Sequence, residues 1–326
     1  MAEYINIKGQ SIEVLASDPA NPTIGQIWYN STSNTLKGGS VTTAATWATG
    51  GNLSSARVYG GSFGGANDAV SMGGENTVSK IDLVEEYNGT SWTTATALPV
   101  ATSVMSGAGS QTTGLGIGGQ APGGNTGNTF TYDGTTWSPT GTMATARGAS
   151  ASGGIQTAAF VAGGNPLSNA TENFNGTSWT TTGNLNTARR FLGGAGTQTA
   201  GLGFGGYTPA TGATEEYNGA TWTTSNPLNT ARGYLRGFGI QTVAVAAGGL
   251  TGGSPNLTAV TEEYDGTSWT NSTNLPTTLY GPYASGIGGN GTSGIIFAGQ
   301  NPVGQTTATQ DYIAAGAPTT KTITVS

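Results

Sequence analysis

Thr214-Glu215-Glu216-Tyr217-Asn218-Gly219-Ala220-Thr221-Trp222-Thr223 is the stretch that decides the fold, because variants of it recur along most of the chain. The same order of acidic residues, aromatic residue, turn and Trp stands at residues 85–92 and 262–269. One Trp marks each unit, and successive units are 42 to 47 residues apart: Trp47, Trp92, Trp137, Trp179, Trp222 and Trp269. Repeats of about 40–45 residues are typical of four-stranded units arranged around an axis. The spacing therefore predicts a repeated β-fold.

Each unit carries further short motifs in a constant order. An apolar run ends in a pair of glycines, and these pairs are Gly73-Gly74, Gly118-Gly119, Gly163-Gly164, Gly205-Gly206 and Gly248-Gly249. After the acidic–aromatic element comes a turn: Asn88-Gly89, Asp133-Gly134, Asn175-Gly176, Asn218-Gly219 and Asp265-Gly266. Asn-Gly and Asp-Gly tolerate positive φ, which predicts two-residue type I′ hairpins. A polar linker then leads to Ala-Arg and the next unit.

These motifs divide each unit into four strands. The first is rich in small residues, as in Gly148–Gly154, which suits a strand crowded around a narrow axis. The second is a short apolar run such as Ala159–Ala162, typical of a strand buried on both faces. The third carries Glu-Tyr, and the fourth carries the Trp at the periphery, where its ring can pack between units. The expected fold is an all-β, six-bladed β-propeller.

The two ends of the repeat region complement each other. Tyr283–Gly289, Gly294–Gly299 and Gln310–Tyr312 predict three strands of a last blade that has no Trp of its own. Trp47 marks a fourth strand with no complete unit before it. We therefore expect the N-terminal strand to complete the sixth blade, which would pair edges that are otherwise exposed. The expected organisation is an extension at 1–34, the propeller at 35–313 and a tail strand at 314–326.

The repeat resembles the kelch family in its glycine pair, in the Tyr that precedes the Trp, and in the Ala-Arg before the next first strand. The resemblance covers residues 35 to 313 and implies a kelch-like propeller. The units here are shorter than the usual kelch unit, and their first strand is small and Gly-rich.

The N-terminal segment has a character of its own. Tyr4–Ile7 and Ser11–Val14 alternate in polarity and predict short strands, and Pro22–Asn30 followed by Thr35–Gly38 predicts a hairpin. The segment Gly25-Gln26-Ile27-Trp28-Tyr29, with Leu36-Lys37 and then Trp47, resembles hairpin modules of bacteriophage tail-fibre and other virion proteins. The extension and the C-terminal tail are expected either to cover the edge of the ring or to attach the chain to other virion proteins.

Composition excludes several functions. The chain contains neither His nor Cys, so the commonest general base and the commonest metal ligand are missing, and there is no Cys-based metal site. No catalytic residues, metal or cofactor are expected, and the chain is expected not to be an enzyme. A net charge of −6 without Lys/Arg runs predicts no nucleic-acid binding. No apolar stretch approaches membrane-spanning length, and Met1–Val14 has no apolar signal region.

Arginines at equivalent positions of four units allow two interpretations: Arg57, Arg147, Arg189 and Arg232. A ring of guanidinium groups could face an anion. Alternatively, each Arg pairs with a glutamate of the acidic–aromatic element, such as Glu86, Glu172, Glu216 or Glu263, because these repeat with the same period. The second interpretation is the simpler one.

The expected function is a non-enzymatic structural or host-recognition protein of a bacteriophage virion, in the tail or on the capsid surface. It would be made in the host cytoplasm and present its loops, with a host surface glycan as one candidate partner. The alternative is a carbohydrate-binding propeller lectin that is not part of a virion. Because a propeller hosts many functions, the fold alone does not choose between them.

Overall fold

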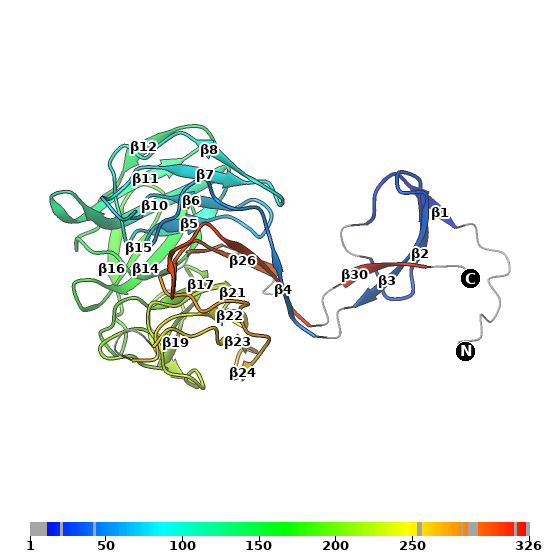
Figure 1. The fold of residues 1–326 in the computed structure, drawn as a ribbon. Coiled ribbons are helices and arrows are strands. Elements are labelled where there is room, and N and C mark those ends of the chain that lie inside the picture. Colours follow the sequence, from blue (N-terminus) through cyan, green and yellow to red (C-terminus); the bar gives the residue numbers. More distant parts are fainter. Residues whose placement is uncertain are drawn as a thin grey trace. The chain divides into compact units, whose positions relative to one another are not determined.

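The chain folds into β-strands and loops. A computed structural model describes residues 12–19, 22–41, 44–252, 256–281, 283–285, 293–315 and 318–323, and no helix occurs among them. The expected all-β class is therefore confirmed for the described part. The chain forms two compact units, one of Met1–Thr46 with Ile313–Ser326 and one of Trp47–Tyr312 (Figure 1).

The larger unit consists of repeated four-stranded sheets, as expected for a propeller-like fold (Figure 1). Five of them, here named sheets I to V, each use four consecutive strands in antiparallel order. Sheet I has β5 (Gly61–Phe63), β6 (Val70–Met72), β7 (Val84–Tyr87) and β8 (Trp92–Ala95). Sheet II has β9 (Ser106–Ser110), β10 (Thr113–Ala121), β11 (Gly124–Tyr132) and β12 (Trp137–Thr140). Sheet III has β13 (Ala151–Ile155), β14 (Ala158–Gly164), β15 (Ser168–Phe174) and β16 (Trp179–Thr182).

The remaining sheets of this unit follow the same plan. Sheet IV has β17 (Gly193–Thr197), β18 (Ala200–Phe204), β19 (Thr214–Tyr217) and β20 (Trp222–Ser225). Sheet V has β21 (Arg236–Ile240), β22 (Val243–Ala247), β23 (Thr261–Tyr264) and β24 (Trp269–Asn271). Sheet VI has β25 (Tyr283–Ser285), β26 (Ser293–Phe297), β29 (Thr309–Ile313) and β4 (Thr46–Thr49). A short hairpin of β27 (Gln300–Asn301) and β28 (Gly304–Gln305) lies between β26 and β29 in sequence.

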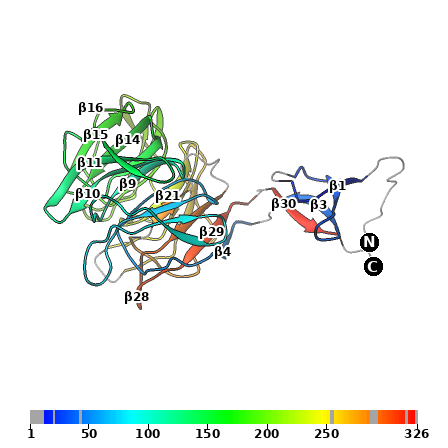
Figure 2. The ribbon, with the colours of Figure 1, turned by 90° about the horizontal axis from the view of Figure 1, so that it is seen from above.

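Sheet VI joins segments far apart in sequence. β4 lies beside β29 (Figure 2), and just past β4 the N–H of Gly50 donates to the carbonyl of Thr309 at 3.0 Å. The first strand of this sheet, expected at 283–289, is described only as Tyr283–Ser285, and residues 286–289 lie outside the described residues. The N-terminal Trp strand therefore supplies the fourth strand of the last sheet.

The glycine pairs are required by the backbone. Both glycines of each pair have positive φ, and Gly118 and Gly119 are representative at 56° and 109°. A Cβ on Gly118 would lie 2.3 Å from the carbonyl oxygen of Arg147 in the linker to the next sheet. The N–H of Gly119 donates to that same carbonyl at 2.9 Å. Only glycine provides this close approach and this conformation together.

The turn between the third and fourth strands differs from the expected type I′ hairpin. In sheet I the strands pair at Tyr87 and Trp92, and Gly89 has a φ of 86° whereas Asn88 is not in the left-handed region. The Asn88 side-chain oxygen instead accepts the N–H groups of Thr90 and Ser91, at 3.0 and 2.9 Å. The Asn or Asp thus caps the turn with its side chain, and only the Gly needs positive φ.

The repeated Trp residues link neighbouring sheets, as expected. Trp222 of sheet IV packs edge-on against Phe160 of sheet III, with ring centroids 5.9 Å apart, and its Nε1 donates to Thr171 Oγ1 at 2.9 Å. Trp269 of sheet V makes similar contacts with sheet IV: its ring is tilted against that of Phe204, with centroids 5.0 Å apart, and its Nε1 donates to Thr214 Oγ1 at 3.0 Å. Each Trp therefore contributes apolar area and one hydrogen bond to the interface with the preceding sheet.

A repeated Gln was not anticipated from the sequence. Gln198, in the turn between the first two strands of sheet IV, donates through Nε2 to the carbonyls of Ala159 and Phe174 in sheet III, at 2.8 and 2.7 Å. Gln156 and Gln241 make equivalent pairs of bonds to their preceding sheets. The Gln-Thr dipeptide in these turns is the signal that could have revealed this clamp.

The smaller unit contains one four-stranded sheet in the order β1 (Glu13–Leu15), β2 (Ile27–Asn30), β3 (Thr35–Val41) and β30 (Pro318–Thr322). The expected hairpin is confirmed as β2 paired with β3. β3 continues beyond the predicted segment and pairs with β30, so residues 35–41 belong to this sheet. The predicted strand at 4–7 and the last residues of the predicted tail strand, 324–326, lie outside the described residues.

Candidate binding face

Four buried arginines form ion pairs inside their own sheets. Each is at most 1% exposed and contacts a glutamate on the third strand of the same sheet. The pairs are Arg57–Glu85 at 2.6 Å, Arg147–Glu172 at 2.6 Å, Arg189–Glu215 at 2.9 Å, and Arg232–Glu262. The predicted partners Glu86, Glu216 and Glu263 are wrong by one position, because successive side chains of a strand point to opposite faces.

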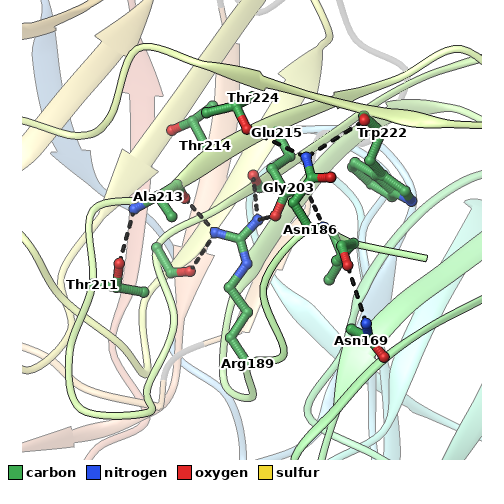
Figure 3. Close-up of polar contacts among 12 residues, drawn as sticks. Asn169, Asn186, Arg189, Gly203, Thr211, Ala213, Thr214, Glu215, Trp222 and Thr224 are labelled. Atoms are coloured by element: carbon green, nitrogen blue, oxygen red, sulfur yellow. Dashed lines mark hydrogen bonds and ion pairs between the residues drawn. The ribbon is translucent and has the colours of Figure 1, made fainter.

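The pair in sheet IV shows what these arginines do (Figure 3). Arg189 donates through Nη1 to the carbonyls of Gly205 and Ala213 and through Nη2 to Glu215. Glu215 also accepts the backbone N–H of Asn186 at 2.7 Å. The ion pair therefore fastens the linker that enters the sheet to its second and third strands.

Burial also excludes the anion-facing interpretation of these arginines, because their guanidinium groups have almost no contact with solvent. Desolvation lowers the pKa of Arg189 to about 10, despite the opposing attraction of Glu215. Desolvation likewise lowers the pKa values of Arg147 and Arg232. Because removing these charges from water costs free energy, they are retained for the ion pairs that hold each sheet together.

The neighbouring acidic residues connect one sheet to the next. They lie on the opposite face of the third strand and accept hydrogen bonds from a tyrosine hydroxyl of the following sheet. These bonds are Tyr132 to Glu86 at 2.7 Å, Tyr264 to Glu216 at 2.6 Å, and Tyr312 to Glu263. Burial and the bond to Glu216 raise the pKa of Tyr264 to about 12.

The junction between sheets VI and I has the weakest member of this series. Asp311 occupies the position of Glu86, and the Tyr87 hydroxyl lies 3.5 Å from its Oδ2, because aspartate is one methylene shorter. Oδ1 of Asp311 is buried and has no hydrogen-bond partner within the described ranges. Burial raises the pKa of this carboxyl.

We expect Asp311→Asn to stabilise the protein at neutral pH. The pKa of Asp311 is higher in the folded protein than the value of about 3.9 in an unfolded chain. As pH rises between these two values the unfolded state loses its proton first, so the carboxyl progressively disfavours the fold. Urea unfolding at several pH values should show a variant–wild-type difference that grows from pH 4 to 7. A difference that does not change with pH would contradict this assignment.

A circuit of backbone hydrogen bonds joins the six segments that lead into the first strands. Each of these segments contributes the residue that stands two positions after the Arg, or after the residue that replaces it. The N–H of this residue donates to the carbonyl of the equivalent residue in the segment before the preceding sheet. The circuit runs through Tyr59, Gly281, Tyr234, Phe191, Ala149 and Val104 and returns to Tyr59. All six have positive φ, between 49° and 59°.

Aromatic side chains gather at this circuit. Tyr59 lies 6.3 Å, between ring centroids, from each of Phe191, Tyr234 and Tyr280. Phe191 stacks on Tyr234 at 3.9 Å, and Tyr207 meets Tyr234 edge-on at 5.6 Å. We call these five residues the aromatic cluster. All five rings are partly exposed. Desolvation raises the pKa of Tyr59 above the ordinary value of a tyrosine, so its hydroxyl stays protonated and can donate hydrogen bonds.

The loops between second and third strands begin beside this cluster. Backbone bridges join Arg190 to Tyr207 and Tyr280 to Gln300, which places the start of each loop next to the circuit. Exposed apolar residues stand in five of these loops: Val78, Pro122, Leu167, Pro209 and Val303. Val78 and Val303 are 88% and 96% exposed. We take the aromatic cluster together with these loops as the candidate binding face, because partly exposed aromatic rings gather where the loops begin.

Sequence reasoning missed this face because, of its aromatic residues, only Tyr207 lies in a loop between second and third strands. The other four stand one or two positions after the Arg or the residue that replaces it, and only some units carry an aromatic residue there. Alignment of the units at the glycine pairs would have shown Tyr59, Phe191 and Tyr234 at one position. In the described residues, no group of three or more acidic side chains could hold a metal, and no helix could span a membrane.

Comparisons with known proteins do not add an identity. No protein-family model matches this chain. No curated protein matches it at a significant level either.

Proposed function

We propose that this chain is a non-enzymatic component of a bacteriophage virion, in the tail or on the capsid surface, that presents a binding face to the host. In this proposal residues 47–312 form a closed, six-bladed, kelch-like propeller. The backbone circuit through six repeat positions supports closure, as does the bond from the Gly299 N–H of sheet VI to the carbonyl of Arg57 at the start of sheet I, 2.9 Å long. The first strand of each sheet also contacts the first strand of the next sheet, and β25 of sheet VI contacts β5 of sheet I.

The observation that carries the proposal is the division of the chain into two compact units. The larger unit bears the aromatic cluster and the exposed loops. The smaller unit is a sheet that unites segments from both ends of the sequence. We infer that the small sheet attaches the protein to other virion proteins, as the resemblance of residues 22–47 to phage hairpin modules suggests. Copies of a rigid face on one particle would then bind with avidity.

A non-enzymatic role agrees with how the acidic residues are used. Glu85, Glu172, Glu215 and Glu262 neutralise buried arginines, and Glu86, Glu216 and Glu263 accept tyrosine hydroxyls. Asp133 and Asp265 accept backbone N–H groups in turns. Carboxylates held in this way serve the framework rather than acid–base chemistry.

Mass spectrometry of purified virus particles tests this function. We expect the protein in the particles at a fixed copy number, and a multiple of three, six or twelve would indicate a symmetric position on the tail or the capsid. Its absence from particles, with the protein recovered only in the soluble lysate, would overturn the virion assignment. The aromatic cluster would then favour the second candidate, a free carbohydrate-binding lectin.

A further inference from the structure

Strained backbone at the circuit indicates that the aromatic cluster serves more than the fold. Tyr59, Phe191 and Tyr234 have φ values of 59°, 53° and 57°, in the left-handed region that bulky side chains rarely adopt. The equivalent residue of sheet VI is Gly281, which adopts φ 58° without this cost. Val104 and Ala149 adopt the same conformation, at 49° and 55°, and make the same hydrogen bond. The backbone circuit therefore does not require a ring, yet three of its six positions carry one.

The polar groups around the cluster indicate the class of ligand. Asn165 and Gln300 directly follow a glycine pair or its equivalent and are partly exposed, and Gln300 accepts the Tyr280 hydroxyl at 2.7 Å, so planar amides border the rings. The Arg190 guanidinium lies 5.7 Å from the centre of the Phe191 ring and donates to Asn165 at 2.9 Å. Amides, tyrosine hydroxyls and one arginine can read an array of hydroxyl groups, while ring faces attract C–H groups through their negative quadrupole.

We propose that the aromatic cluster and its bordering amides bind a neutral hexopyranose unit of a glycan. This inference rests on the recognition role proposed above and names its ligand. A pyranose has an apolar face of C–H groups and a rim of hydroxyls, which match the rings and the amides respectively. Glu75 near Tyr59 and Arg190 beside Phe191 bring one charge of each sign to the cluster, and the other residues after the glycine pairs are uncharged: Gln120, Asn165, Tyr207, Leu250 and Gln300. A neutral sugar therefore fits better than an acidic one.

The test uses the purified full-length protein on an array of neutral oligosaccharides, followed by titration of the best ligand. Tyr207→Leu and Tyr280→Leu are the informative variants, because neither residue has positive φ and the change leaves the strained positions intact. We expect each to weaken binding at least tenfold while the thermal midpoint stays close to wild type. Tyr29→Leu, in the smaller unit, is the matched control and should bind like wild type.

The outcomes separate this inference from the function on which it rests. No binding of wild type to any neutral glycan, or equal binding by Tyr207→Leu and Tyr280→Leu, would overturn the sugar site even if the protein is present in particles. Capture of a host polypeptide that Tyr280→Leu abolishes, without sugar binding, would also overturn it in favour of a protein receptor. Tyr280→Phe provides a further check: loss of its bond to Gln300, 2.7 Å long, should weaken sugar binding by less than Tyr280→Leu does.

Discussion

Deletion of residues 1–50 should lower the thermal midpoint of the larger unit by about 10 °C or more. The deletion removes β4, so β29 becomes an unpaired edge in sheet VI. It also removes Trp47, whose ring lies 4.7 Å from that of Tyr312 and whose Nε1 donates to the Thr273 carbonyl at 2.9 Å. Loss of a large packed aromatic alone costs about 3–5 kcal/mol when fully buried, and Trp47 is partly buried. Calorimetry on both proteins measures the effect.

A shorter deletion distinguishes the contribution of β4 to stability from that of the small sheet. Deletion of residues 1–43 removes β1 to β3 but keeps β4, and should leave the midpoint of the larger unit near that of the wild type. A peptide of residues 44–53 added to the longer deletion should restore part of the stability, because it supplies the missing strand. Equal midpoints for the 1–43 and 1–50 deletions would mean that β4 does not stabilise sheet VI. The exposed edge also predicts aggregation of the longer deletion alone.

The sequence predicted the repeated sheets well because each required motif is local. The glycine pair is needed wherever the backbone turns left-handed against the next linker, and the Trp is needed wherever two sheets pack. Both requirements recur in register, so they are visible without any other chain. The repeat order also assigned the Trp47 strand to the last sheet, because the C-terminal unit has three strands and lacks the fourth, Trp-bearing strand.

Contacts that depend on side-chain direction were harder to predict. Glu215 and Glu216 are adjacent and chemically identical, yet one pairs with a buried arginine and the other accepts a hydroxyl from the next sheet. The repeat period shows that both glutamates recur, but only the register of the strand shows which of the two faces the buried arginine. The aromatic cluster was missed for a related reason: Tyr59 and Tyr234 are 175 positions apart, and their rings meet only because the backbone circuit brings the segments before the first strands together.

Arg189→Met should lower the free energy of unfolding by about 3–5 kcal/mol, because it leaves Glu215 buried without its counter-charge. The carboxylate would keep its bond to the Asn186 N–H but lose the guanidinium. The Gly205 carbonyl would lose its bond from Arg189, and the Ala213 carbonyl would keep only the N–H of Gly205. Urea unfolding measures the loss. Arg190→Met is the matched control, since that neighbouring arginine is partly exposed and should cost less than about 1 kcal/mol.

The double variant Arg189→Met/Glu215→Leu should recover most of this loss, because the chain already contains sheets that dispense with the pair. In sheet II the equivalent positions hold Thr102 and Phe130, and in sheet VI they hold Leu279 and Gln310. Wherever the arginine is absent the glutamate is absent too, which indicates that the two charges are needed for each other rather than for the sheet. Buried ion pairs replaced by apolar residues of similar size are often neutral or stabilising. A double variant no more stable than Arg189→Met would show instead that the guanidinium is needed for its bonds to the linker and strand carbonyls.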